Sequence, residues 1–239
     1  MEKIEGIILK KIDYKESSKI IYLYTNHGLV SVLIHGSNKM KSPYLSLTKP
    51  LNLVSLQVSG KDLKVLRDAD IINDYRKISN DLEKYTYSTH ILEIIYYFST
   101  HEHDHKKLYD FLIKIFDIVE ENDNYIPYLN MIELKLLYLL GVNPLFNHCV
   151  SCDSTENLAF SVEAGGMCCP SHMVKKSIIS ALGLLEMQQL YYYDLNKPSN
   201  LNINQVYLKE IRLVLDKYYE YHLNFKSNSR KILIGLIGY

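Results

Sequence analysis

The spacing of hydrophobic residues differs between the first 75 residues or so and the rest of the chain. Up to about residue 75, β-branched and aromatic residues alternate with polar ones in five short runs, separated by turn sequences such as Asn26-His27-Gly28 and Gly60-Lys61-Asp62. The runs are Ile4–Ile12, Lys19–Thr25, Leu29–Gly36, Leu51–Ser59 and Leu63–Ile72. Five short strands leave exposed edges in an open sheet, and closure into a barrel removes them. The pattern predicts an oligonucleotide/oligosaccharide-binding (OB) barrel, and an SH3-like barrel fits nearly the same pattern.

From Ile78 onward the period changes to that of a helix. Leu82, Tyr85, Thr89, Leu92 and Tyr96 share one stripe, with Ser79 as a candidate N-cap. Further helices are predicted through Leu108–Val119, from Pro127 to a C-terminal cap at Gly141, and over Ser180–Tyr192, Asn204–Leu223 and Arg230–Ile237. The sequence predicts an α+β, multi-domain protein: an OB domain (1–77), then an all-α domain (78–239) with a loop-rich insert at 143–174.

The composition of the 239 residues is that of a globular protein, with 47% hydrophobic and 23% charged residues. The longest apolar runs are as short as Leu136–Leu140, against the ~20 residues that a membrane span needs. The first 25 residues carry several charges and no long apolar segment, so we expect no secretory signal and a cytoplasmic chain.

The net charge of zero conceals an asymmetry. Residues 1–80 contain 13 Lys and Arg against 8 Asp and Glu, a net charge of +5, and the remainder carries 14 against 19, a net charge of −5. Such a split suggests a nucleic-acid contact on the positive part, although a solvated surface would give the same count.

The four cysteines all lie between residues 149 and 169. Cys149-Val-Ser-Cys152 is followed, about 16 residues later, by Cys168-Cys169-Pro-Ser-His172. Two such knuckles can direct four ligands at one tetrahedral zinc ion. Cys149, Cys152, Cys169 and His172 form a Cys3His set, and Cys168 remains an alternative third ligand.

Other uses of these side chains fit less well. Disulfides are disfavoured in a chain without an export signal. A catalytic zinc needs an open coordination position, which four protein ligands do not leave. The alternation His101-Glu-His103-Asp-His105 could bind a metal, but its position between two helices favours a solvated loop.

The lysines of the predicted barrel are candidates for contact with DNA. Lys10, Lys11, Lys15 and Lys19 flank the turn between the first two strands, and Lys39 and Lys41 lie in the loop Gly36–Pro43. Such loops can follow a phosphate backbone without reading bases. Of the 21 tyrosines, Tyr14, Tyr22, Tyr24 and Tyr44 are placed to stack on bases, although packing in the core is the commoner role.

Several short segments, taken in order, make the chain similar to the bacterial RecO family of recombination mediators. They are Asp13–Glu16, Leu23–Thr25 with Gly28, the loop Gly36–Ser42, Gly141–Pro144 before the first knuckle, Phe160-Ser161, Gly165-Gly166 before the second knuckle, and Ser229–Lys231. The resemblance covers the whole length. In that family the second knuckle reads Cys-x-x-Cys two residues after the double glycine, which selects Cys169 and puts His172 in place of a cysteine.

The resemblance implies an OB barrel, a helical domain and a zinc-ribbon-like insert with one structural Zn²⁺. It also implies a non-enzymatic, nucleoid-associated protein that binds single- and double-stranded DNA and anneals complementary strands. With RecR, such a protein helps RecA load onto DNA covered by single-strand-binding protein, whose C-terminal tail it docks.

Three other functions remain open at this point. The chain could be an adaptor that binds protein partners with little DNA affinity of its own, a zinc-dependent enzyme acting on nucleic acid, or a transcription regulator. The last would need base-specific contacts, for which the sequence offers no candidates.

Overall fold

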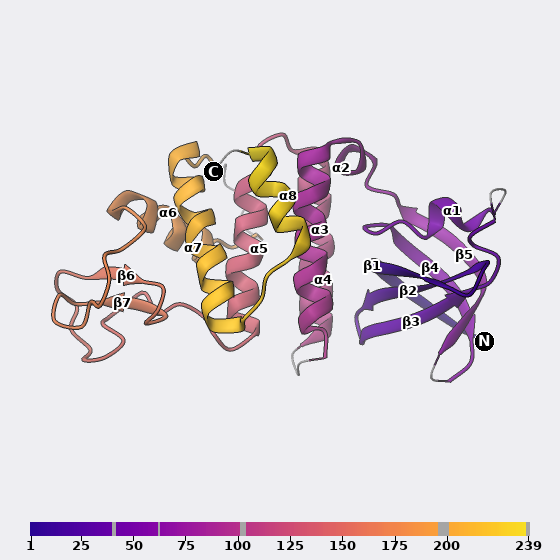
Figure 1. The fold of residues 1–239 in the computed structure, drawn as a ribbon, viewed down its shortest axis with the longest axis horizontal. Coiled ribbons are helices and arrows are strands. Elements are labelled where there is room, and N and C mark those ends of the chain that lie inside the picture. The colour runs from indigo at the N-terminus through magenta and orange to yellow at the C-terminus, as the bar shows by residue number, and fades with distance from the viewer. Residues whose placement is uncertain (40–41, 62, 101–103, 196–200, 238–239) are drawn as a thin grey trace. The chain divides into compact units, whose positions relative to one another are not determined.

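The computed structural model describes the chain except for residues 40–41, 62, 101–103, 196–200 and 238–239 (Figure 1). Contacts group it into two compact units, described here one at a time. The first comprises Met1–Glu121 together with the segment that starts at Ser227, and the second comprises Asn122–Lys226. This grouping does not test the predicted division at residue 77, which stays a prediction.

The first unit contains the predicted barrel of five strands (Figure 1). The closed order is β1-β2-β3-β5-β4, formed by β1 (Glu2–Tyr14), β2 (Ser18–Thr25), β3 (Gly28–Ile34), β4 (Leu53–Ser59) and β5 (Lys64–Asn73). Neighbouring strands are antiparallel except β3 and β5, which pair in parallel at only two positions. Each observed strand overlaps one of the five predicted from period-two alternation, so the predicted fold class is confirmed.

The pairing of β1 with β2 is irregular at one point. Ile8 lies opposite Leu23, but Lys10 lies opposite Tyr22, so one extra residue, Leu9, is accommodated in β1. Such a β-bulge shifts every following side chain to the other face of the strand. Without the bulge, Lys10 would lie on the core-facing side of β1 and Lys11 on the outer side. With it, the two lysines exchange sides, so that Lys10 faces outward and Lys11 lies on the core-facing side.

The interior of the barrel is apolar and closed by a short helix. Side chains of all strands except β5 form the buried cluster, and the one-turn helix α1 (Tyr44–Leu47) adds Leu47. Leu66 and Ala69 of β5 are partly buried and pack against the cluster. Helix α1 was not predicted, because a single turn has no measurable hydrophobic period.

Three helices follow the barrel in the first unit: α2 (Arg76–Asn80), α3 (Leu82–Phe98) and α4 (His105–Glu121). The side chain of Asp81 accepts a hydrogen bond from the backbone N–H of Lys84 and so caps α3. The predicted cap at Ser79 was wrong, because Ser79 lies within α2, which the sequence pattern did not separate from α3.

The last helix, α8 (Asn228–Ile237), returns to the first unit and packs along α3 (Figure 1). The Ser227 hydroxyl accepts a hydrogen bond from the backbone N–H of Arg230 (2.8 Å), which is the geometry of an N-cap. The Glu93 carboxylate of α3 accepts hydrogen bonds from the backbone N–H of Asn228 (3.0 Å) and the hydroxyl of Ser229 (2.7 Å). Polar groups therefore fix where α8 begins on α3.

The second unit contains α5 (Ile126–Leu139), α6 (Ala181–Tyr192), α7 (Gln205–Leu223) and the two-stranded sheet of β6 (Ala159–Ser161) and β7 (Gly166–Cys168). Pro127 stands in the first turn of α5, and Ser180 and Asn204 cap α6 and α7 with their side chains. Gly141, with a φ of +72°, follows the end of α5, as predicted. No described helix has the length and hydrophobicity that crossing a bilayer requires.

A buried ion pair joins α5 to α7. The Arg212 guanidinium, 1% exposed, contacts both oxygens of the fully buried Glu133 carboxylate and donates to Asp216 (3.0 Å). The hydroxyl of Tyr219 donates to the backbone carbonyl of Glu133 (3.0 Å). Removing one partner of such a pair leaves an uncompensated charge in the core.

We therefore expect Arg212→Met to lower the free energy of unfolding by about 3–5 kcal/mol. Urea denaturation followed by circular dichroism measures the change. Lys209→Met, an exposed lysine on the same helix, is the control and should change stability little. Adding Glu133→Leu should restore much of the loss, because the unpaired carboxylate is then removed; equal stability of Arg212→Met and wild type would contradict the prediction.

Candidate nucleic-acid interface and metal centre

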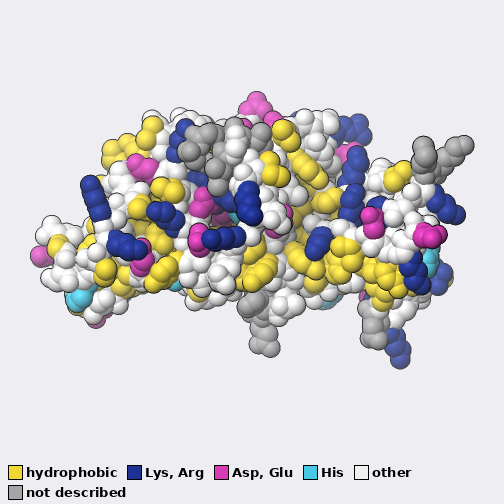
Figure 2. All heavy atoms as spheres, viewed as in Figure 1, with side chains coloured by type: hydrophobic (Ala, Val, Ile, Leu, Met, Phe, Trp, Pro, Cys, Tyr) yellow, Lys and Arg dark blue, Asp and Glu magenta, His cyan; other side chains and the backbone are white. Residues whose placement is uncertain are grey.

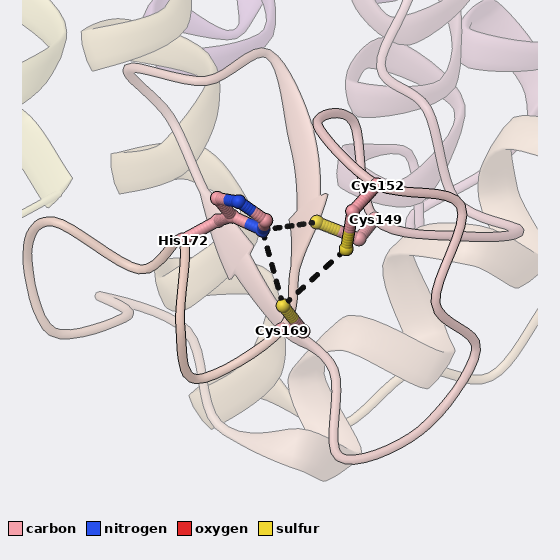
Figure 3. Close-up of side chains that lie close together, drawn as sticks. All are labelled: Cys149, Cys152, Cys169 and His172. Carbon is pink, nitrogen blue, oxygen red and sulfur yellow. Dashed lines mark hydrogen bonds between the residues drawn. The ribbon is translucent and has the colours of Figure 1, made fainter.

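Three cysteines and one histidine of the second unit converge, as Figure 3 shows. The ligand atoms of Cys149, Cys152, Cys169 and His172 all lie within 4.8 Å of one another. The Cys152 and Cys169 sulfurs are 3.7 Å apart, and Nδ1 of His172 lies 3.3 Å from Cys169 Sγ and 3.6 Å from Cys149 Sγ. The structure brings together the four side chains that the two knuckles predicted.

Each knuckle is a tight turn closed by a backbone hydrogen bond. The N–H of Asp153 donates to the carbonyl of Cys149 (3.2 Å), and Asp153 has a φ of +56°. The N–H of His172 donates to the carbonyl of Cys169 (3.0 Å). A two-residue spacer therefore directs both side chains of each knuckle to the same side.

Gly166 lets two segments of the insert pass close to each other next to the knuckles. A Cβ on Gly166 would lie 2.5 Å from the backbone oxygen of Leu145, so only glycine fits beside that segment. The N–H of Val150 donates to the carbonyl of Met167 (2.9 Å), which ties the first knuckle to β7.

Helix α7 holds the other side of the insert. The hydroxyl of Tyr218 donates to the carbonyl of Gly165 (3.2 Å), and Nε2 of His222 donates to the carbonyl of Val162 (2.6 Å). Phe146 and Phe160 stack within the insert, with ring centroids 5.9 Å apart. The double glycine thus lies between the cysteine knuckles and a helix of the same unit.

The cluster fits a tetrahedral metal ion. Zinc–sulfur bonds of ~2.3 Å and zinc–nitrogen bonds of ~2.0 Å imply ligand–ligand edges of roughly 3.5–3.8 Å, close to the three separations observed. Backbone N–H groups of Cys169 and Ser151 lower the pKa of Cys149 to about 6, which favours the thiolate form that binds a metal ion. Hydrogen bonds to Cys169 and Cys149 raise the pKa of His172, as expected beside negative charge. The donor set is compatible with a single zinc ion.

Cys168 does not belong to this group. It lies at the end of β7 opposite Ala159, and burial raises the pKa of its thiol. Of the histidine alternation, His101 and His103 lie outside the described residues. His105 lies in the first unit, with Nδ1 3.0 Å from the Tyr24 hydroxyl, and joins no metal-binding group among the described residues.

The barrel lysines split into two sets. The Lys10 ammonium lies over the ring of Tyr96 in α3, 4.8 Å from its centroid, on the outer face of the barrel. Lys11 lies opposite the fully buried Ile21 and so shares the face that leads into the core. The structure therefore does not bring Lys10 together with the other lysines.

The Lys19 side chain contacts two other residues of the first unit. Its ammonium pairs with Asp13 (3.1 Å) and contacts the Asn38 side chain, and the side chain is only 12% exposed. The amide of Asn38 donates to Asp13 (3.2 Å), and its backbone N–H donates to the carbonyl of Ser17 (3.1 Å). Lys19 therefore ties the turn after β1 to the loop after β3.

Lys15 and Lys39 are exposed, and Lys41 lies outside the described residues. Lys15 occupies the turn after β1 with a φ of +55°, and its ammonium lies over the Tyr14 ring (5.3 Å). Figure 2 shows basic, acidic and apolar side chains mixed on the face of the barrel that it presents.

The four candidate stacking tyrosines all have contacts inside the first unit. Tyr24 is fully buried, and burial raises its pKa. Tyr22 meets Tyr96 edge to face (5.3 Å), Tyr44 packs on the barrel core, and Tyr14 lies under Lys15. The structure thus favours packing roles for Tyr22, Tyr24 and Tyr44.

Comparison with known proteins gives a match to two family models. The model described as "Recombination protein O N terminal" matches residues 1–75, and "Recombination protein O C terminal" matches residues 79–231. The chain is similar to the DNA repair protein RecO of Bacillus cereus (strain AH187), with 26% identity over 97% of this chain and 96% of the relative. It is also similar to the DNA repair protein RecO of Exiguobacterium sibiricum, with 27% identity over 100% of this chain and 98% of the relative.

The pairing of Asp13 generates a testable pH dependence. Hydrogen bonds from Lys19 and Asn38 lower the pKa of Asp13 in the folded state. Its contribution to stability is therefore present above the ordinary aspartate pKa and is lost as the pH falls through the lowered folded-state pKa. We expect the difference in unfolding free energy between wild type and Asp13→Asn, measured with urea, to stay constant from pH 6 to about pH 5 and to shrink as the pH falls further towards 3.

The control is Asp70→Asn, which removes an exposed carboxylate of β5. Its difference from wild type should vary less with pH than that of Asp13→Asn. A constant difference for Asp13→Asn over the whole range would mean that the pairing contributes nothing in solution.

Proposed function

Since the chain belongs to the RecO family, we propose that it is a DNA repair protein that acts as a recombination mediator and catalyses no reaction itself. The observation that carries this proposal is the match of both family models over nearly the whole chain, onto a barrel with a basic end. In this role it binds single- and double-stranded DNA and promotes annealing. With RecR, it promotes loading of RecA onto DNA covered by single-strand-binding protein.

The contact with DNA is electrostatic and independent of base sequence. Lys11, Lys15, Lys39 and Lys41 supply it, with Lys19 holding two of the loops in place. Lys10 lies over Tyr96 and is not expected to contribute. The engagement of the barrel tyrosines within the unit supports recognition through phosphates rather than through stacked bases.

The metal centre serves as scaffolding in this proposal. One zinc ion held by Cys149, Cys152, Cys169 and His172 would fix the two knuckles of an insert that has little regular structure besides β6 and β7. Four protein ligands fill a tetrahedron and leave no position for a substrate or a water molecule.

An adaptor that recruits proteins with little DNA affinity is the second candidate. It is favoured by an exposed apolar stripe on α6, where Leu182, Leu185 and Tyr192 are each more than half exposed. Fluorescence anisotropy of the purified chain with a labelled oligonucleotide at low salt separates the two functions. A bound complex supports the mediator, and its absence supports the adaptor.

Lys39→Ala should weaken oligonucleotide binding about fivefold at 0.1 M salt. The loss of one phosphate contact lowers the slope of log affinity against log salt by roughly 0.7 for single strands. Anisotropy titrations at several salt concentrations measure both quantities. Lys209→Ala, an exposed lysine of α7, is the matched control, and identical slopes for the two variants would remove Lys39 from the interface.

For the metal, we expect one zinc ion per chain in wild type and in Cys168→Ser, but much less than one in Cys149→Ser. Elemental analysis after dialysis gives the stoichiometry. Absorption of the cobalt-substituted protein identifies tetrahedral thiolate ligation. Loss of the metal in Cys168→Ser with retention in Cys149→Ser would show that Cys168 is the ligand.

A further inference from the structure

The end of the barrel where β1 turns into β2 gathers charges on its inner face. After the bulge at Leu9, Lys11 lies opposite Ile21, and Asp13 lies opposite Lys19. Directly opposed residues share a face of the sheet, and Ile21 belongs to the barrel core. Lys11, Asp13 and Lys19 therefore continue the core-facing side to the opening of the barrel, here called the barrel mouth.

A strained turn adds a third lysine to the barrel mouth. Leu51 is buried with a φ of +79°, a conformation that costs a side-chain-bearing residue roughly 1–3 kcal/mol. Its N–H donates to the carbonyl of Ile8 (2.8 Å), and the N–H of Ile8 donates to the carbonyl of Asn52 (2.9 Å). These bonds fix the turn to β1 three residues before Lys11, and the turn carries Lys49, an exposed residue.

The surroundings of Lys11 lower the pKa of its ammonium group. Burial of its side chain and then the charge of Lys19 lower its pKa, Asp13 opposes the shift, and the charge of Lys49 lowers it further. Lys11 therefore lies within electrostatic reach of both Lys19 and Lys49.

The barrel mouth has more positive than negative charge. Asp13 is engaged with Lys19, which Asn38 also contacts. Among the described residues, neither Lys11 nor Lys49 forms an ion pair. Three ammonium groups against one carboxylate leave a surplus of two positive charges, which a bound anion would offset.

We propose that Lys11 and Lys49 bind one phosphate group of a nucleic-acid backbone at the barrel mouth, and that Lys19 is a positioning residue held by Asp13 and Asn38. The inference rests on the proposed function and deepens it. It moves the principal contact from the loop after β3 to a rigid part of the barrel and adds Lys49. Lys15 and Lys39 lie on the two flanking loops, and the exposed Glu16 shares the turn with Lys15.

The test compares Lys11→Met, Lys49→Met and the double variant with Lys107→Met. Methionine keeps an unbranched stem for packing and removes the charge. Lys107, an exposed lysine of α4, is the control; α4 begins at His105, whose ring lies against Gly28 at the other end of β2. Anisotropy with a single-stranded oligonucleotide over a range of salt gives the affinity and its salt slope.

Because the two lysines share one phosphate, we expect the double variant to lower the slope by about 0.7 and to bind about 25-fold more weakly at 0.1 M salt, with each single variant between it and wild type. Lys107→Met should match wild type. Asp13→Asn should bind more tightly and with a steeper slope, because it releases the Lys19 charge. If wild type binds and the double variant equals Lys107→Met, the barrel-mouth site is wrong while DNA binding stands. If wild type fails to bind at low salt, the proposed function itself fails.

A second measurement identifies the source of the phosphate. Lysine side chains are labelled by ¹³C-methylation, and the Lys11 and Lys49 signals are assigned by their loss in the variants. Shifts on addition of the oligonucleotide at concentrations far below those needed for inorganic phosphate, at constant ionic strength, support the site. Shifts with inorganic phosphate alone, or with an acidic peptide as readily as with the oligonucleotide, would overturn its assignment to nucleic acid.

Discussion

The β-bulge at Leu9 is the constraint from which the surface chemistry of the barrel follows. Side chains alternate strictly along a strand, so one extra residue exchanges the faces of all that follow. Because of the bulge, Lys10 points outward to Tyr96 of α3, whereas Lys11 points to the barrel mouth. Two adjacent lysines of the same strand thereby acquire different environments, one over an aromatic ring and the other among positive charges.

The helices of the first unit limit which parts of the barrel can meet a partner. The outer face of β1 and β2 is occupied by Tyr96, and the far end of β2 by His105, which is hydrogen-bonded to Tyr24 and packed on Gly28. Two of the four tyrosines that could have stacked on bases, Tyr22 and Tyr24, are engaged in these contacts. The opposite end of the barrel carries Lys15 and Lys39 on two loops and Lys49 on the turn of Leu51, and it is the proposed site of contact with a polyanion.

The second unit is organised by two polar clusters. Arg212 and Glu133 join α5 and α7 through a buried ion pair, and three cysteines and one histidine lie together where two turns of the insert meet. Tyr218 and His222 of α7 hold the backbone of the insert from the other side. The negative part of the chain thus uses its polar groups mainly for internal order, in keeping with the proposed division between a DNA-binding barrel and a helical part that recruits proteins.

The sequence by itself determined the elements and the donor set. Five runs of period two became five strands, helical stripes became α3 to α8, and two knuckles at fixed spacing placed Cys149, Cys152, Cys169 and His172 together, because each of these depends on local geometry. The sequence pattern did not predict α2 as a separate helix. A single residue, the N-cap Asp81, decides that α2 ends and α3 begins there. The roles of Lys10, Lys11, Lys19 and Lys49 were decided only by the tertiary structure, because a bulge, an ion pair between two strands and a turn fixed to a distant strand leave no periodic trace in the sequence.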